Sequence, residues 1–333
     1  MKTWKKAASL IIAGRIASKP NQVYNYNLLF LKRSNKGSFG GAYVFPGGMI
    51  EPSDADLKWQ SLFQNYGYNE NSFKSLIPKS KTRPKIFDNF DNELPREVSL
   101  RISAIRETFE ECGILFCTNS ISTNTTSKLG NNFDLTNDEL KYWQHKVHND
   151  STEFYNMCQE LKCYPNLWAL YEWRNWISAS NFAIAKHVNA VFFFTGLPNI
   201  PNTKLECNEM DDFLWATPDY MLKTHITSLF PPQRYELLEL VNYTNIDNLI
   251  DCAVEKSKNG APSFFPVAVG LSDGLVFVLP GDSMYPNDIN IHERKQIDLS
   301  SMSIKQFREI TATTNRIEIF NDPENKDRIP SKL

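Results

Sequence analysis

The chain has 333 residues, and its 36 Lys and Arg against 38 Asp and Glu give a formal net charge of −2. This length is enough to bury a full core and suits one large domain or two ordinary ones. The near-neutral balance excludes a global basic field, so we expect no binding to nucleic acid. No apolar run approaches the ~20 residues that span a bilayer, so we expect a soluble protein with no membrane span.

The first predicted elements are strands. Residues 8–16 (ASLIIAGRI) and 26–33 (YNLLFLKR) are apolar runs of strand length, and residues 40–48 (GGAYVFPGG) predict a strand that enters a turn. The basic and then apolar beginning of the chain also suits a transit peptide. Its apolar part is short and no small-residue cleavage site follows, so a buried strand is the favoured interpretation.

An insertion and then a helix are predicted next. Periodicity fades from residue 52 to residue 100, which predicts an insertion at about 55–105. The sequence REVSLRISAIRETFEECGI then has the apolar spacing of an amphipathic helix, and Gly113 supplies its end. The apolar face of this helix consists of Val98, Ile102, Ile105 and Phe109.

Later elements mix helices and strands. Thr136 and Glu139 fit a capping box that opens a helical region reaching roughly to Trp176, so residues 118–180 are a second predicted insertion. VNAVFFFTGL at 188–197 predicts a buried strand, FLWATPDYMLK a strand followed by a helix, and FPVAVGLSDGLVFVLPGD a hairpin. This alternation places the fold in the α/β or α+β class.

The six cysteines form no CxxC motif and have no paired histidines near them, so a zinc site is not expected. Two pairs, Cys112 with Cys117 and Cys158 with Cys163, share a four-residue gap that would allow metal binding. Scattered free thiols in a reducing compartment are the favoured interpretation.

Three glutamates stand out in RETFEECGI, where Glu107, Glu110 and Glu111 occupy positions i, i+3 and i+4 of one helical face. Like charges at this spacing repel one another, and a solvated surface face is one interpretation. The other is a divalent metal site, because a hard cation takes oxygen ligands and offsets the repulsion. The upstream turn VFPGGMIEPSD favours the metal site, since glycine lets the backbone approach a ligand closely.

Together these motifs resemble the box of the Nudix hydrolases, GX5EX7REUXEEXGU, in which U is a bulky aliphatic residue. It is read here as Gly48, Asp54 and the segment 106–114. Asp54 stands where the box has Glu, Thr108 occupies an aliphatic position, and 51 residues replace the usual seven.

A longer resemblance covers nearly the whole chain. Six features are similar in kind and order to those of the nudix-type motif 19 family of coenzyme A diphosphatases. They are the interrupted box, LLFLKRS…VFPGG, LWALYEWRNWI, LFPPQRYELLEL, VFVLPGD and a peroxisomal terminus. The similarity implies a Nudix α/β/α sandwich with a mixed sheet over residues 1–245. It also implies a C-terminal extension over residues 246–333, with a hairpin and a targeting tail.

The resemblance also implies residue roles. Glu107, Glu110 and Glu111 would bind Mg²⁺ or Mn²⁺. The carbonyl of Gly47 would add a ligand, and Arg106 would brace the carboxylates. The metals would bridge a diphosphate and lower the pKa of the attacking water, with Glu111 or Glu110 as general base. Coenzyme A or acyl-coenzyme A would give 3′-phosphoadenosine 5′-phosphate and (acyl-)4′-phosphopantetheine.

Substrate recognition has several candidate residues. The basic side chains just before the turn would bind the 3′-phosphate, with solvated loop charges as the alternative; they are Lys32, Arg33 and Lys36. The run PKSKTRPK at 78–85 is a second candidate. Glu209 and Glu206 are candidates for a further loop acid. The tryptophans of the second insertion are expected to pack rather than to stack on adenine; they are Trp168, Trp173 and Trp176.

The sequence is compatible with two other functions. The same chemistry could act on NADH or ADP-ribose derivatives, because the box does not set the substrate. A silent Nudix-like binding module would keep the fold without turnover. The terminal Ser331-Lys332-Leu333 is the receptor-read peroxisomal address. We therefore expect a peroxisomal protein that binds the import receptor.

Overall fold

The structure, a computed structural model, describes residues 4–17, 19–35, 40–80, 82–120, 128–178, 187–205, 209–289 and 297–321. The strands are β1 (Lys5–Arg15), β2 (Tyr26–Arg33), β3 (Tyr43–Val44), β4 (Gly47–Met49), β5 (Cys117–Thr118), β6 (Tyr164–Pro165), β7 (Tyr171–Ile177), β8 (Val188–Leu197), β9 (Met210–Ala216), β10 (Ser263–Phe264), β11 (Val267–Leu271), β12 (Gly274–Val278), β13 (Ile297–Leu299) and β14 (Arg316–Phe320). The α-helices are α1 (Lys58–Gln64), α2 (Glu70–Lys74), α3 (Arg96–Cys112), α4 (Asn137–Asn149), α5 (Glu153–Glu160), α6 (Pro218–Thr224), α7 (Pro231–Leu240), α8 (Ile246–Asn259) and α9 (Ile304–Glu309). The 3₁₀ helices are η1 (Pro52–Ala55), η2 (Lys85–Phe87), η3 (Leu167–Ala169) and η4 (Ile226–Ser228).

Within the described residues, an eight-stranded mixed sheet forms the centre of the molecule. Its main strand order is β10-β7-β8-β1-β2-β3, while β4 pairs with β1 and β9 with β2. β1 runs parallel to β8, from Lys5 opposite Val188 to Gly14 opposite Leu197, and antiparallel to β2 and β4. The interpretation of the first apolar run as a buried strand is therefore confirmed.

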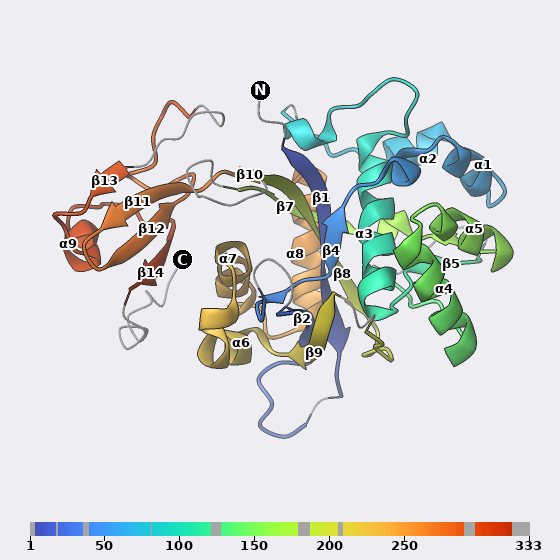
Figure 1. Cartoon of the computed structure of the whole chain (residues 1–333), viewed down its shortest axis with the longest axis horizontal. Helices are drawn as coiled ribbons and strands as arrows, with labels where there is room; N and C mark the ends of the chain where they lie inside the picture. The colour runs from blue at the N-terminus through green and yellow to red at the C-terminus, as the bar shows by residue number, and fades with distance from the viewer. Residues whose placement is uncertain are drawn as a thin grey trace.

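Both faces of this sheet are covered. Successive side chains of a strand point to opposite faces, so Leu10 and Ile12 of β1 join one core and Ile11 and Ala13 join the other. The helix α3 covers the first face, and α7 and α8 cover the second (Figure 1). This is the layered α/β/α arrangement that the sequence predicts, and it explains why the strands read as continuous apolar runs.

The helix α3 forms and ends as its sequence predicts. The whole apolar face from Val98 to Phe109 is buried. Gly113 follows in a left-handed conformation with φ 72°, and its N–H donates to the carbonyl of Phe109. Glycine adopts this conformation without a Cβ clash. The helix end is thereby fixed two residues after Glu111.

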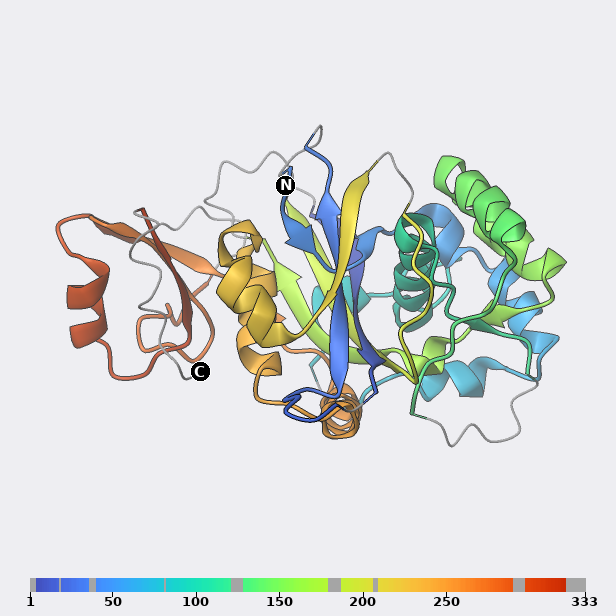
Figure 2. The same ribbon diagram turned by 90° about the horizontal axis from the view of Figure 1, so that it is seen from below.

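The helical part of the second insertion, α4 and α5, lies outside α3, and α4 packs on the side of α3 away from the sheet (Figure 2). The predicted capping box is present: the Thr136 hydroxyl accepts from the Glu139 N–H, and the Glu139 carboxylate accepts from the Thr136 N–H. The Gln144 amide of α4 donates to the carbonyls of Phe109 and Glu110. The bond to Glu110 gives a partner to a carbonyl in the last turn of α3, where the carbonyl groups lack partners within the helix.

The prediction that the helical region reaches roughly to Trp176 is wrong beyond residue 160. It ends with α5, and Tyr171–Ile177 is strand β7, which pairs antiparallel with β8. This pairing buries Trp173 and Trp176 in the core beneath α7 and α8. Aromatic residues favour a pleated surface that is packed on both sides, and this tertiary packing outweighs the helical pattern.

A balanced set of buried charges joins β7 to α7 and α8, and we call it the Arg174 network. The carboxylate of Glu236 accepts from Nε of Arg174 at 2.8 Å and from the indole N–H groups of both β7 tryptophans at 2.6 Å. Glu239 pairs with Arg174 and with Lys256. Two cations thus face two carboxylates.

The C-terminal part of the chain forms a second sheet beside α7 (Figure 1). In the described residues its strand order is β13-β11-β12-β14. β11 and β12 form the predicted hairpin, with Leu271 opposite Gly274, and Ile304 and Phe307 of α9 pack against it. No helix in the described ranges is long and apolar enough to cross a membrane. The terminal tripeptide at 331–333 lies outside the described residues.

Candidate active site

The three glutamates lie in the last two turns of α3, where the helix packs against β4 and η1. Glu110 and Glu111 are only 8 % and 5 % exposed, and the side chain of Glu107 is 14 % exposed. The interpretation as a solvated surface face is therefore wrong. Charged side chains are rarely withdrawn from water without a compensating partner, so the partners of these carboxylates decide what the site can do.

Arg106 binds Asp54 through both ends of its planar fork. Its Nε donates to Oδ1 at 2.8 Å and its Nη2 donates to Oδ2 at 2.9 Å. The N–H of Glu51 also donates to Oδ2, at 2.9 Å, which holds the carboxylate in place. The 51 residues between Asp54 and Arg106 loop away, and the shorter Asp still completes a bidentate pair.

Arg106 also contacts two of the three helix glutamates. Its Nη1 donates to Glu110 Oε1 at 2.5 Å, and its Nη2 lies 3.0 Å from Glu107 Oε1. The same Nη2 donates to the carbonyl of Met49 in β4, at 3.0 Å. One guanidinium thus ties η1, β4 and α3 together and sets the positions of the carboxylates. We call Asp54, Glu107, Glu110 and Glu111, with Arg106, the carboxylate cluster.

The glycine turn lies directly against this cluster. The N–H of Gly47 donates to Glu111 Oε2 at 2.8 Å. Gly47 has φ +148°, and a Cβ there would lie 2.4 Å from the carbonyl of Ala8. A Cβ on Gly48 would lie 2.3 Å from Glu107 Oε2. Gly47 therefore requires glycine, because the backbone of β4 approaches β1 too closely for a side chain. A side chain at Gly48 would displace the Glu107 carboxylate.

The charge in the cluster is not balanced. Burial raises the pKa of Glu107 to about 8, although Arg106 opposes the shift. Burial also raises the pKa of Glu111 well above its usual range, repulsion by Glu107 adds to this, and the Gly47 N–H opposes it. Burial likewise raises the pKa of Glu110, against the effect of Arg106. The positive charge near each glutamate is therefore too small to offset the cost of burying its ionised form.

These residues fit a divalent cation. Four carboxylates face one guanidinium, and no other Lys or Arg in the described ranges forms an ion pair with any of them. Hard cations such as Mg²⁺ and Mn²⁺ prefer carboxylate and carbonyl oxygens. A cation bound by Glu107, Glu110 and Glu111 would supply the charge that Arg106 alone does not.

The predicted substrate residues do not all lie together. Arg33 is on the α3 face of β2, and it lowers the pKa of Glu111 while Glu209 raises it, both as minor influences beside burial. Lys32 points to the opposite face, where its ammonium lies 5.9 Å from the centre of the Tyr43 ring. Lys36 and Glu206 lie outside the described residues. Glu209 stays a prediction for the additional acid.

The other candidates are engaged in packing. Arg83, in the run PKSKTRPK, forms a two-bond ion pair with buried Glu172. Trp168 stacks on Tyr68 with ring centres 4.2 Å apart, and the β7 tryptophans bond to Glu236. The preference for packing over adenine stacking is supported by these contacts.

No separate role is predicted for Asp54 or Gly48 from the sequence. Their positions in the Nudix-like box were the available signal, but the contacts arise only when η1 and β4 meet α3. The distance along the chain conceals the pair that Asp54 forms with Arg106.

Comparisons with known proteins cover most of the chain. Residues 4–240 match a family model described as NUDT19 Nudix domain, and residues 269–325 match one described as NUDT19 C-terminal domain. A protein of Xenopus laevis named acyl-coenzyme A diphosphatase NUDT19 is 35 % identical over 321 residues, which cover 89 % of this chain and 84 % of that protein. Its human namesake is 28 % identical, over 87 % of this chain and 82 % of that protein.

A solved structure supports the fold. A Nudix hydrolase from Alicyclobacillus acidocaldarius superposes with a TM-score of 0.54 at 18 % identity, covering 75 % of this chain and 97 % of that one. At this identity the likeness concerns the arrangement of the backbone only.

Proposed function

The chain belongs to the NUDT19 family of Nudix hydrolases, and from that premise we propose that it hydrolyses the diphosphate bond of coenzyme A and acyl-coenzyme A. The products would be 3′-phosphoadenosine 5′-phosphate and (acyl-)4′-phosphopantetheine. The observation that carries the proposal is the buried carboxylate cluster with its uncompensated charge. The family relation supplies the substrate, because two relatives at 28–35 % identity are named acyl-coenzyme A diphosphatases.

Nudix hydrolases need a divalent metal, and we propose Mg²⁺ or Mn²⁺ here. Glu107, Glu110 and Glu111 would hold it, with the carbonyl of Gly47 as a further ligand. When bound, the cation neutralises charge on the diphosphate and lowers the pKa of a water molecule. Arg106 would act as a positioning residue that holds Asp54 and η1 in place against α3.

The protein's own groups supply the remaining steps. Glu111 or Glu110 would accept the proton of the attacking water, and burial raises the pKa of each carboxyl, which makes its carboxylate a stronger base. The Gly47 N–H keeps Glu111 in a fixed orientation. Burial around α3 excludes bulk water, which strengthens the electrostatic interactions in the site.

Arg33 is the basic residue best placed to bind an anionic group of the substrate, because it lies on the same face of the sheet as Glu111. Arg33→Ala should raise the KM for coenzyme A by about tenfold or more, the usual cost of a lost charged hydrogen bond. Dephospho-coenzyme A should lose less if the contact is to the 3′-phosphate. Lys32→Ala is the matched control, since Lys32 points to the other face. An equal loss in both variants would contradict this assignment.

Product analysis tests the function itself. Purified protein would be incubated with coenzyme A and Mg²⁺ or Mn²⁺ in H₂¹⁸O, and the products identified by mass spectrometry. We expect metal-dependent formation of 4′-phosphopantetheine, with ¹⁸O on the phosphate that was attacked. NADH and ADP-ribose serve as comparison substrates. If coenzyme A survives while one of these is cut, the substrate proposed here is wrong. If nothing is cut, the binding-module hypothesis takes its place.

We also propose that the protein resides in peroxisomes, delivered by the import receptor through Ser331-Lys332-Leu333. Fluorescence microscopy of the tagged chain should show it with a peroxisomal marker, and removal of the three residues should release it to the cytosol. Unchanged distribution after the removal would contradict the proposal.

A further inference from the structure

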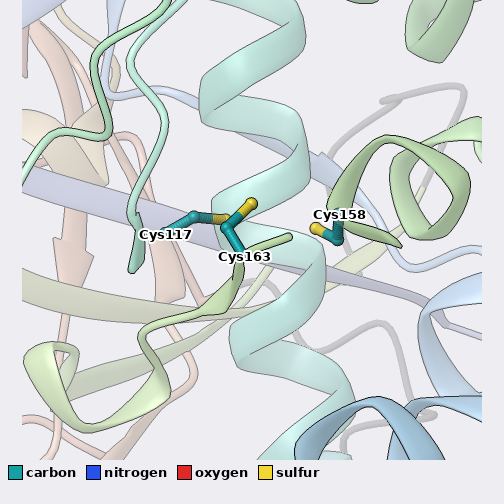
Figure 3. A group of neighbouring side chains, drawn as sticks. All are labelled: Cys117, Cys158 and Cys163. Atoms are coloured by element: carbon teal, nitrogen blue, oxygen red, sulfur yellow. The ribbon is translucent and has the colours of Figure 1, made fainter. Parts of the chain in front are cut away.

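Three thiols converge apart from the carboxylate cluster, one just before the second insertion and two within it. Cys117 begins β5, Cys158 lies on α5 and Cys163 precedes β6. Their sulfur atoms all lie within 4.8 Å of one another. Figure 3 shows the three side chains extending toward a common centre from their separate elements. None is more than 1 % exposed, so the expected scatter of thiols is replaced by a compact buried group.

Backbone geometry holds the three positions together. β5 and β6 pair antiparallel with Cys117 opposite Pro165, which brings Cys117 near Cys163. After α5 the chain turns back at Lys162, which has a left-handed φ of 51°, and the Cys163 N–H donates to the carbonyl of Cys158 at 2.9 Å. The arrangement is therefore imposed by a strand pair and a helix end rather than by the flexible side chains.

The surroundings of the thiols favour a soft ligand. All three belong to the main apolar core, where the rings of Tyr66 and Tyr164 are close enough for the thiols to influence their pKa values, after the larger effect of burial. Thiolates prefer soft metal ions such as Cu(I) or Zn²⁺, whereas Mg²⁺ and Ca²⁺ require oxygen ligands. The group therefore differs in kind from the carboxylate cluster.

The number of ligands distinguishes the two soft ions. Within the described residues, no fourth His, Cys, Asp or Glu joins this group. Cys112, the fourth member of the paired gaps, instead donates to the carbonyl of Thr108 in its own helix. Structural zinc almost always has four ligands, so three thiols alone suit Cu(I) better.

We propose that Cys117, Cys158 and Cys163 form a metal site that binds one Cu(I) ion through their three sulfur atoms. The ion would link α5 and the residue before β6 to β5, which follows α3 in the chain. It would therefore stabilise the insertion against the Nudix core without taking part in hydrolysis. The proposal is independent of the substrate proposed above.

The protonation of the group is compatible with this site. The thiols of Cys117 and Cys158 donate to the sulfur of Cys163 and lower its pKa to about 5. Burial raises the pKa values of Cys117 and Cys158. The sulfur atoms bind such an ion as thiolates, so binding releases protons and the apparent affinity should rise with pH.

The test is an anaerobic titration of the reduced full-length protein with Cu(I), supplied as its acetonitrile complex. Binding would be measured against a colorimetric Cu(I) chelator, and X-ray absorption would count the bound sulfur atoms. Cys158→Ala removes one ligand. Cys252→Ala is the matched control, because Cys252 lies on α8 and contacts the Tyr243 hydroxyl instead.

We expect the wild type and Cys252→Ala to bind one Cu(I) with three sulfur atoms, and Cys158→Ala to lose this ion. Cu(I) should also raise the unfolding temperature of the wild type, a readout that remains if Cys158→Ala does not fold. Equal Cu(I) binding by Cys158→Ala, or no binding by the wild type, would overturn the proposal. Four-coordinate zinc in the purified protein, or loss of two free thiols as a disulfide, would overturn it as well.

Discussion

Two buried groups of charges on opposite faces of the same sheet differ in one respect. The Arg174 network joins two cations to two carboxylates, and the indole N–H groups of β7 complete the bonds of Glu236. The carboxylate cluster sets four carboxylates against Arg106 alone in the described part of the chain. Arg174 and Glu236 are as deeply buried as the cluster, whereas Glu239 and Lys256 are partly exposed. The main difference between the two groups is the balance of charge.

The difference separates structural charges from functional ones. A buried group whose charges and hydrogen bonds are satisfied has no need of a ligand. A buried group with excess negative charge must take up protons or a cation, and the raised pKa of Glu107 shows the first alternative. The following predictions test whether removal of a carboxylate harms function in one group and stability in the other.

The largest effect is expected for Glu111→Gln. Turnover should fall by about 10²–10⁴-fold, the usual contribution of a catalytic acid or base. The fold should remain, because the amide oxygen can still accept from the Gly47 N–H. Steady-state kinetics and circular dichroism measure both results, with exposed Glu160→Gln as control. Normal activity in Glu111→Gln would disprove the role given to the cluster.

Glu236→Gln should act on stability instead. Both oxygens of Glu236 accept from N–H donors, so the NH₂ group of glutamine would face a donor, and Arg174 would keep only Glu239 as an ionised partner. Breaking a buried pair in this way costs about 3–5 kcal/mol, measurable as a lower free energy of unfolding in urea. Activity per folded molecule should not change. For comparison, Glu255→Gln on the exposed surface of α8 should cost less than about 0.5 kcal/mol.

Gly48→Ala should disturb the cluster without removing a charge. The added Cβ would lie 2.3 Å from Glu107 Oε2, so the carboxylate must move. The metal concentration for half-maximal activity should rise by about 10–100-fold, as for other changes that misplace a ligand. Gly67→Ala adds a methyl group to open space at φ +86°. It should reduce stability but leave the metal requirement as it is.

The last prediction concerns the effect of pH on the stability of the metal-free protein. The pKa of Glu107 is raised from 4.5 in its ordinary state to about 8 in the folded one, so the folded state binds more protons between these values. Stability is then fully present below pH 4.5 and is lost as pH rises through 8. Urea unfolding across this range should show the decline, and Mn²⁺ should reduce it. A metal-free protein that gains stability over this range would contradict the assignment.

The sequence correctly predicted the features that depend on residues close together in the chain. The apolar spacing of α3, its Gly113 end, the Thr136 cap and the strand at 188–197 each depend on neighbours in the sequence, and each is present. The segment 171–177 was predicted incorrectly because its strand character comes from pairing with β8.

The same limit applies to the predicted functional residues: only contacts between residues close in the sequence could be predicted. The spacing of Glu107, Glu110 and Glu111 was visible because one helix carries all three. The pair between Asp54 and Arg106, the opposite directions of Lys32 and Arg33, and the gathering of three thiols depend on which segments meet in space. A single sequence does not contain that information directly.

The identification of the carboxylate cluster as the metal site can be tested by one set of unfolding temperatures. They would be measured for wild type, Glu111→Gln and Glu236→Gln with and without Mn²⁺ at neutral pH. Binding to the folded state alone stabilises by about 2.7 kcal/mol at one hundred times the dissociation constant. We predict that Mn²⁺ raises the unfolding temperature of wild type and of Glu236→Gln but has a much smaller effect on Glu111→Gln. An equal rise in all three proteins, or none in the wild type, would contradict the identification of the unbalanced cluster as the metal site.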